Sequence, residues 1–229
     1  MIIRVKNIID EDFLQYKKPS MFIGFSRCNF KCGKNLCQNT PLARSKDILV
    51  STSMIYERYN QNPITKAVVL GGLDPFDTPE ECYRFCYDFR LSTTDDIVIY
   101  TGYTEEEIAN NDLLRHYHEV IIALKNVIIK YGRFIPNQES HYDEILGVNL
   151  ASPNQYAIRY WGGFMKYKIN DDKELVTKIR VSLKDNKGYC PCVFNSQGKE
   201  EYKCPCKNFR EEVPVGEICH CGLFIKTEI

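Results

Sequence analysis

Three closely spaced cysteine pairs near the C-terminus constrain this chain more than any other feature. They are Cys190-Pro191-Cys192, Cys204-Pro205-Cys206 and Cys219-His220-Cys221. Two cysteines separated by one residue do not readily bond to each other, but they place two sulfur atoms in one small volume. Three such pairs therefore predict a sulfur-lined pocket for a metal centre. Six thiols exceed the four that a zinc ion or a cubane iron–sulfur cluster needs, so two remain beside the metal, and a dithiol touching an iron–sulfur cluster is a redox device.

The composition favours metal or catalytic roles for these thiols. The chain has 229 residues, enough for one large and one small domain, and 44% hydrophobic residues support a packed core. A net charge of zero provides no field for nucleic acid or an anionic membrane, so we expect neither as a partner. Residues 1–5 lack a signal-peptide pattern and no apolar run approaches a membrane span, which predicts a cytoplasmic protein. In a reducing compartment, eleven cysteines favour metal sites over a disulfide framework.

The first two-thirds of the chain alternates patterns that are typical of strands and helices. Thr78-Pro79 marks one helix start, with a cap followed by proline at the first helical position, and Thr104 with Glu107 forms a capping box for another. This alternation predicts an α/β fold with a parallel sheet, and a small partial (β/α) barrel fits as well as an open sheet. The runs that we expect to form buried strands are 2–9, 21–25, 67–70, 97–100 and 127–131.

The pattern changes after Trp161-Gly162-Gly163. A charged helical stretch from about Asp172 to Lys184 leads into the paired cysteines, and strand signals become few. We therefore predict two domains, 1–164 and 165–229, the second small and mainly helical.

A second group of cysteines follows the predicted strand 21–25. Cys28, Cys32 and Cys37 share one loop, and three thiolates can bind three irons of a cubane cluster and leave the fourth iron open. An open position is how catalytic metal sites receive a substrate. A zinc site, or a loop without metal, is the alternative. By contrast, Cys82 and Cys86 lie one turn apart on a predicted helix among aromatic residues, and buried free cysteine behaves as a small hydrophobe, so we assign these two to the core.

Three further motifs follow the cysteine loop at characteristic intervals. They are Gly71-Gly72-Leu73-Asp74-Pro75, Tyr100-Thr101-Gly102-Tyr103-Thr104, and Gly132-Arg133-Phe134 with Ser152-Pro153-Asn154-Gln155. In order and spacing, over about residues 1–160, the set resembles the radical S-adenosylmethionine superfamily and, within it, the activating protein of anaerobic ribonucleotide reductase. The chain departs from that family in having four residues rather than two between Cys32 and Cys37, and in the extra Leu73. A loop absorbs added residues at little entropic cost.

This resemblance implies a partial-barrel domain that generates a radical. Cys28, Cys32 and Cys37 would bind a [4Fe–4S] cluster whose open iron chelates S-adenosylmethionine. Reductive cleavage would yield a 5′-deoxyadenosyl radical, which removes a hydrogen atom from a glycine of the large subunit of an anaerobic ribonucleotide reductase. The residues that would contact the cosubstrate are Gly71, Gly72 and Asp74 at its amino group, Leu36 near its adenine, and Thr101 at a strand end.

The three C-terminal pairs support a second resemblance. The order C-P-C, C-P-C, C-H-C, followed by Gly222-Leu223-Phe224, resembles the catalytic subunit of ferredoxin:thioredoxin reductase over about residues 172–229. The spacers differ from the usual ones, and the domain is shorter than a free-standing subunit. Carried over by position, the likeness implies that Cys192 and Cys221 form a redox-active disulfide and that His220 assists proton transfer beside it. It implies that the ligands of a second [4Fe–4S] cluster are Cys190, Cys204, Cys206 and Cys219.

Together the two resemblances predict a fusion of an activase with a disulfide reductase. Its expected cofactors are two [4Fe–4S] clusters and S-adenosyl-L-methionine. Its expected partners are the anaerobic ribonucleotide reductase, a ferredoxin or flavodoxin as electron donor, and a thioredoxin-like protein. Two alternatives stay open: a C-terminal cluster that only relays electrons to the N-terminal one, and a zinc-binding interaction module without catalysis.

Overall fold

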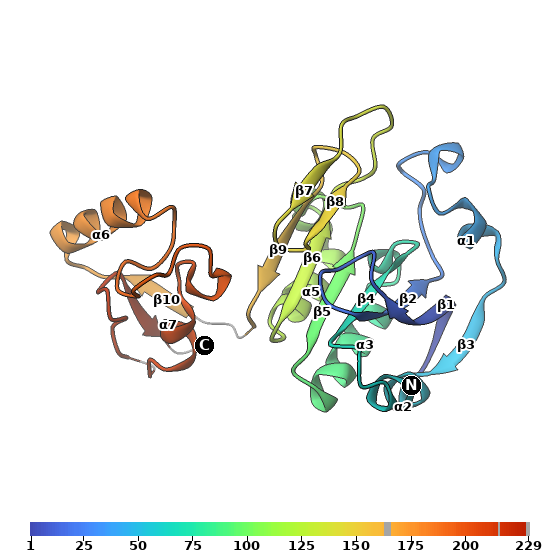
Figure 1. Cartoon of the computed structure of the whole chain (residues 1–229), viewed down its shortest axis with the longest axis horizontal. Coiled ribbons are helices and arrows are strands. Elements are labelled where there is room, and N and C mark those ends of the chain that lie inside the picture. The colour runs from blue at the N-terminus through green and yellow to red at the C-terminus, as the bar shows by residue number, and fades with distance from the viewer. Residues whose placement is uncertain (163–165, 215, 228–229) are drawn as a thin grey trace. The chain divides into compact units, whose positions relative to one another are not determined.

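The computed structural model describes residues 1–162, 166–214 and 216–227. The chain divides into two compact units, Met1–Gly163 and Phe164–Ile229 (Figure 1). The domain boundary that we expected near residue 164 falls on residues 163–165, which lie outside the described residues.

The N-terminal unit is built on a seven-stranded mixed sheet with the strand order β3-β1-β2-β4-β5-β6-β9 (Figure 1). β2, β4, β5 and β6 are mutually parallel, whereas β1, β3 and β9 join antiparallel at the two sides. All five predicted strands are present and the α/β class is confirmed, while the curvature of a partial barrel stays a prediction. The strands are β1 Ile2–Asp12, β2 Ser20–Phe25, β3 Ile48–Ser51, β4 Ala67–Gly72, β5 Asp96–Tyr100, β6 Val127–Tyr131 and β9 Tyr156–Tyr160.

The two predicted helix starts are confirmed. α3 begins at Pro79, directly after Thr78. Before α4, the Thr104 hydroxyl accepts from the Glu107 amide (3.2 Å) and the Glu107 carboxylate accepts from the Thr104 amide (3.1 Å), which completes the capping box. The helices of this unit are α1 Thr40–Arg44, α2 Thr52–Gln61, α3 Pro79–Ser92, α4 Glu105–Ala109 and α5 Asp112–Ile122, with short 3-10 turns at Lys34–Leu36 and Pro75–Asp77.

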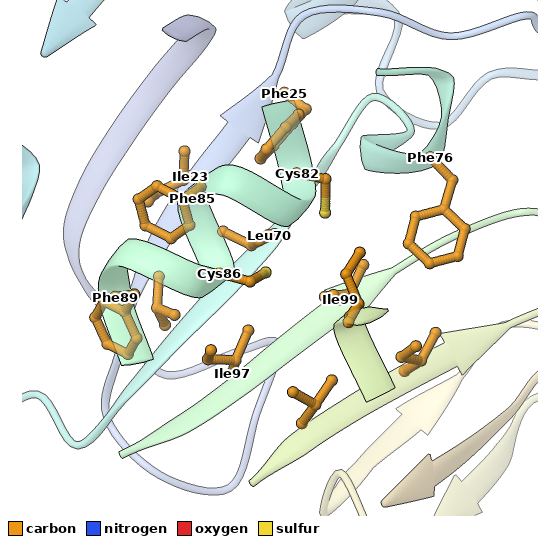
Figure 2. Close-up of a cluster of buried hydrophobic side chains, with 14 of the residues drawn as sticks. Ile23, Phe25, Leu70, Phe76, Cys82, Phe85, Cys86, Phe89, Ile97 and Ile99 are labelled. Atoms are coloured by element: carbon orange, nitrogen blue, oxygen red, sulfur yellow. The ribbon is translucent and has the colours of Figure 1, made fainter. Parts of the chain in front are cut away.

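The two faces of the sheet are covered differently. α2, α3 and α5 pack on one face, where Cys82 and Cys86 lie fully buried among Phe85, Phe89 and the strand side chains (Figure 2). Their predicted core role is confirmed. The other face packs against Tyr16 and the small hairpin of β7 (His141–Asp143) and β8 (Val148–Leu150).

The C-terminal unit contains little regular structure. α6 (Lys173–Asp185) is capped by Asp172, whose carboxylate accepts from the amides of Glu174 (3.1 Å) and Leu175 (3.0 Å). α6 and α7 (Lys207–Glu211) contribute 13 and 5 residues, so helix is the largest regular component of a unit that consists mostly of turns and irregular chain. A two-stranded sheet pairs β10 (Lys166–Ile169) with β11 (Phe224–Thr227).

Within the described part of the chain, no helix combines the length and the apolar character that crossing a membrane requires.

A buried ion cluster fixes the end of the sheet at which β5 begins. The Asp96 side chain, 5% exposed, accepts from Arg159 (2.8 Å), Lys18 (2.6 Å) and Tyr16 (2.8 Å). Burial alone would raise the pKa of Asp96, but the hydrogen bond from Arg159 and the charge of that guanidinium, helped by Lys18 and Tyr16, hold it below its ordinary value. The cluster therefore links β5 to β9 and to the β1–β2 loop.

We expect Asp96→Asn to destabilise the N-terminal unit by about 3 kcal/mol at neutral pH, because it leaves the buried Arg159 guanidinium without its counter-ion. Unfolding followed by the fluorescence of Trp161, the single tryptophan, reports on this unit. The matched control is Asp10→Asn, which removes an exposed pair with Arg58 and is expected to cost less than about 1 kcal/mol.

The same pair of variants has a defined pH dependence. Because the folded pKa of Asp96 is lowered, its stabilisation is complete above the unfolded value of about 4 and is lost as the pH falls through the folded value. The difference in the free energy of unfolding between the wild-type protein and Asp96→Asn should therefore become smaller below about pH 4. An equal cost for Asp96→Asn and Asp10→Asn would contradict the role of the cluster.

Candidate functional site

A cavity of about 390 Å³ lies where the parallel strands end. Most of the predicted site residues that line it come from loops that directly follow β2, β4 and β5. They meet there because the carboxyl ends of parallel strands lie at one edge of a sheet. Seven of the eight residues predicted for the N-terminal site line this cavity: Cys28, Cys32, Leu36, Cys37, Gly72, Asp74 and Thr101.

Gly71 is the eighth residue, and it does not line the cavity. It lies inside β4, and a side chain at this position would meet the Phe22 ring at 3.3 Å and Tyr100 at 3.4 Å. Gly72, the next residue, has φ +81°, and a Cβ there would approach Leu42 to 2.6 Å. Both glycines therefore permit close packing, and Gly72 in addition adopts a backbone conformation that other residues rarely take.

Asp74 is held rigidly at the cavity wall. Its carboxylate accepts from the Phe76 amide (3.0 Å), the Thr101 hydroxyl (2.9 Å) and the Gly102 amide (2.8 Å). Burial nevertheless raises its pKa to about 6. Thr101 thus orients Asp74, so a hydrogen bond joins these two predicted site residues.

The cysteine loop is fastened to the Pro75–Asp77 turn and to Tyr103 of the Tyr100–Thr104 motif. The backbone amide of Asn29 donates to the Asp77 carboxylate (2.7 Å). The side-chain amide of Asn29 donates to the same carboxylate (3.0 Å) and to the Tyr103 hydroxyl (2.6 Å). Tyr103 also donates to Asp77 (2.7 Å). These bonds set the position of the Cys28 end of the loop.

The three cysteines of this loop suit a metal centre whose positive charge would stabilise their thiolate forms. All three are half-buried. Burial raises the pKa of Cys28 to about 11. Burial, and next the neighbouring Cys37, also raise the pKa of Cys32. Metal ligands must be thiolates, so a bound cation would supply the charge that favours this form. In the described part of the chain, no three His, Cys, Asp or Glu side chains are arranged around a single-ion position. The donor set itself, three thiols on one loop beside a cavity, fits a cluster.

Lys130 is a cavity residue that the sequence interpretation missed. It lines the cavity from β6, is only 6% exposed, and donates to the carbonyl oxygens of Gly132 (2.7 Å) and Thr101 (3.5 Å). Burial lowers its pKa to about 8. The available signal was a lysine inside the apolar run Val127–Tyr131, since lysine is rarely buried without a reason.

Five of the six paired cysteines belong to the core of the C-terminal unit or pack against it, and the sixth, Cys192, lies beside them at the surface. The Cys190 thiol is within hydrogen-bonding reach of those of Cys206 and Cys221, and the sulfur atoms of Cys219 and Cys221 are 3.3 Å apart. Cys204 lies within electrostatic range of Cys190, Cys206 and Cys219. Three separate pairs are therefore brought into one sulfur-lined volume.

The exposure of these thiols divides them into groups. Cys190, Cys206 and Cys219 are buried, Cys204 and Cys221 are half-buried, and Cys192 is exposed. The Cys192 thiol lies within hydrogen-bonding reach of Cys190 and Cys221. One sulfur is thus available to a partner, and a second, half-buried sulfur lies within reach of it.

His220 is exposed on the turn between Cys219 and Cys221. Within the described ranges, its ring makes no hydrogen bond. A role for it in proton transfer stays a prediction.

The electrostatics of the six thiols favour a metal centre. Burial and the neighbouring thiols raise the pKa of Cys204 to about 12, and the hydrogen bond with Cys190, together with burial, raises that of Cys206. So many thiolates in one volume repel one another unless a cation lies between them. The donor set fits a four-thiolate cluster with two sulfurs to spare.

Comparison with known families matches both regions of the chain. Residues 19–155 match the family model of the 4Fe-4S single cluster domain, and residues 153–229 match that of the ferredoxin thioredoxin reductase catalytic beta chain. No curated protein and no solved structure matches the chain significantly.

The second match confirms the C-terminal resemblance, whereas the more specific N-terminal resemblance to radical activases stays a prediction. The two matches indicate an iron–sulfur protein with a part that is similar to a disulfide reductase. Since the first match spans more than half of the residues, the chain belongs to the 4Fe-4S single cluster domain family.

Proposed function

We propose that the protein is an iron–sulfur oxidoreductase whose C-terminal unit reduces disulfides. The observation that carries this proposal is the convergence of six thiols of which Cys192 is exposed with Cys221 within reach of it. The match of residues 153–229 to a ferredoxin thioredoxin reductase chain supports it. Cys190, Cys204, Cys206 and Cys219 would hold a [4Fe–4S] cluster.

The exposure of Cys192 supports its role as the attacking thiol, and the role of Cys221 is carried over from the matched family. Cys192 attacks a sulfur of the target disulfide, and Cys221, within reach of Cys192, displaces the target from the mixed disulfide. The cluster would supply electrons one at a time to restore the dithiol. By analogy with the matched family, the electron donor would be a ferredoxin or a flavodoxin. The target would be a thioredoxin-like protein or the cysteines of an anaerobic ribonucleotide reductase.

The test of this function is disulfide reduction by the full chain after anaerobic reconstitution with iron and sulfide. The reduced protein, freed of reductant, should convert a stoichiometric amount of an oxidised thioredoxin to its dithiol. A protein that binds zinc in place of iron and reduces no disulfide would support an interaction module instead.

A second function is favoured by the cavity of the N-terminal unit. We propose that this unit is a radical S-adenosylmethionine activase, because the three cysteines of one loop share a cavity with Gly72, Asp74 and Thr101. Cys28, Cys32 and Cys37 would hold a second [4Fe–4S] cluster. The cosubstrate, when bound, would supply the radical that removes a hydrogen atom from a glycine of an anaerobic ribonucleotide reductase.

The charged cavity residues suit the two ends of an amino acid. The Asp74 carboxylate would face the amino group of the cosubstrate, with a backbone carbonyl of the glycine pair beside it. The Lys130 ammonium would face its carboxylate. Leu36, 48% exposed on the Lys34–Leu36 turn, offers an apolar surface for the adenine.

Joining the two units in one chain has a physical advantage. A ribonucleotide reductase needs its radical generated once and its reducing thiols restored at every turnover. Tethering raises the effective concentration of the second unit at a target that the first has bound. Alternatively, the C-terminal cluster only relays electrons to the N-terminal cluster. Replacing Cys192 or Cys221 should then barely affect the protein, whereas replacing Cys204 should abolish radical generation.

We expect Lys130→Met to weaken the binding of S-adenosylmethionine by about 10- to 100-fold, because one charge-assisted hydrogen bond is lost. Since burial lowers the Lys130 pKa to about 8, wild-type affinity should decline as the pH rises past that value, and the variant should lack this decline. Equilibrium binding to the reconstituted protein measures both effects. Lys125→Met, outside the cavity lining, is the control, and equal affinity of wild type and Lys130→Met would contradict the assignment.

A further inference from the structure

The loop that follows the first cysteine pair carries an exposed aromatic ring next to the exposed thiol. Cys192 is exposed, and Phe194 is 90% exposed, more than any other large hydrophobic side chain of the described residues. Consecutive Cα atoms are about 3.8 Å apart, so those of Cys192 and Phe194 lie within about 7 Å of each other. The exposed thiol and the exposed ring are therefore two residues apart on one short segment of the loop.

This loop is anchored on both sides of the ring. The Ser196 hydroxyl, 3% exposed, donates to the carbonyl oxygen of Cys190 (2.9 Å), and the Asn186 side chain donates to the Ser196 hydroxyl (3.1 Å). The Cys190 amide donates to the carbonyl oxygen of Tyr202 (2.8 Å). The segment from Cys192 to Asn195 is thus the tip of a fastened loop, which lowers the entropic cost of ordering it on a partner.

The sequence neighbours of the ring are uncharged. Residues 190–197, Cys-Pro-Cys-Val-Phe-Asn-Ser-Gln, contain no acidic or basic side chain. We therefore expect recognition by these residues to be apolar, with a contribution to partner binding that depends little on ionic strength.

We propose that Phe194 is the recognition residue through which Cys192 selects protein disulfides over small-molecule disulfides. The inference rests on the proposed disulfide reductase. Any protein that forms a mixed disulfide with Cys192 must bring its surface within reach of a side chain two residues away. A protein whose disulfide borders an apolar hollow would bury the ring, whereas a small disulfide has no surface to cover it.

The exchange itself balances without another reactant. The Cys192 thiolate bonds to one sulfur of the protein disulfide, and the second sulfur of that disulfide leaves as a thiolate. The Cys221 thiolate then bonds to Cys192 and expels the first sulfur, also as a thiolate. Two electrons pass from the dithiol to the protein disulfide, and the two protons of the dithiol end on the two released thiols.

The test compares two probes in single-turnover reactions of the reconstituted, fully reduced chain. The protein probe is an oxidised thioredoxin, and the small probe is bis(2-hydroxyethyl) disulfide. Phe194→Ser should lower the rate constant for the protein probe by at least about tenfold and that for the small probe by less than about twofold. Phe194→Leu should restore much of the loss, and the control Val181→Ser, which changes a 56% exposed residue on α6, should alter neither rate.

The outcomes separate the inference from the function beneath it. If Phe194→Ser lowers the rate constants for both probes equally, or lowers neither, Phe194 is not a recognition residue. The proposed disulfide reductase function would be unaffected by that result. A wild-type protein that reduces neither probe refutes the reductase and the inference together.

Discussion

Replacing Cys192 with serine should abolish disulfide reduction, by on the order of a thousandfold or more, and leave the iron content unchanged. Cys192 is the exposed member of the six converging thiols, so its loss removes the attacking sulfur. The cluster ligands are assigned to other positions, so about eight irons per chain should remain after reconstitution. Iron analysis and single-turnover reduction of an oxidised thioredoxin measure the two quantities.

The matched variant is Cys204→Ser, which removes one thiol from the same volume. It should lose about four irons and the corresponding electron paramagnetic resonance signal, because Cys204 is assigned as a ligand. Full disulfide reduction by Cys192→Ser would contradict the proposed role of this thiol. If radical generation is lost in Cys204→Ser but kept in Cys192→Ser, the C-terminal cluster is a relay.

Replacing Cys28 with alanine should abolish cleavage of S-adenosylmethionine, again by on the order of a thousandfold, and leave disulfide reduction intact. The loop has three thiols, so the loss of one leaves a cluster without a full set of protein ligands. About four irons should be lost, and the signal that shifts on addition of S-adenosylmethionine should disappear. Methionine release and iron content are the measurements.

Cys86→Ala provides the control for this change. It removes a thiol from the same unit, but from the core beneath α3, and should retain about eight irons (Figure 2). A folded Cys28→Ala protein that loses both activities would show that the two units do not work independently.

The sequence predicted the central parallel strands because each is a short apolar run that is buried on both faces. It did not predict β3, β9 or the β7–β8 hairpin. β9 places one charged residue, Arg159, among apolar and aromatic ones, and its position beside β6 depends on pairing between segments far apart along the chain. β7 and β8 have three residues each, too few for a periodic pattern.

The candidate site was predictable where its signals are local. Cysteine spacing and the residues that follow buried strands are visible in the sequence, and seven of the eight N-terminal residues share one cavity. Lys130 was missed because its contribution depends on which way a strand residue faces. The bonds from Asn29 to Asp77 and Tyr103 join residues 48 and 74 positions apart, and only the folded chain brings them together.

The core of the C-terminal unit has a consequence for the life of the protein in the cell. Among the described residues of this unit, three of the eight buried core residues, Cys190, Cys206 and Cys219, are proposed as metal ligands, so the proposed cluster would complete its interior. We expect iron supply to set the abundance of the protein, since a chain made under iron starvation would keep an open C-terminal region for proteases to cut. A half-life that is the same in starved and iron-replete cells would argue against this coupling.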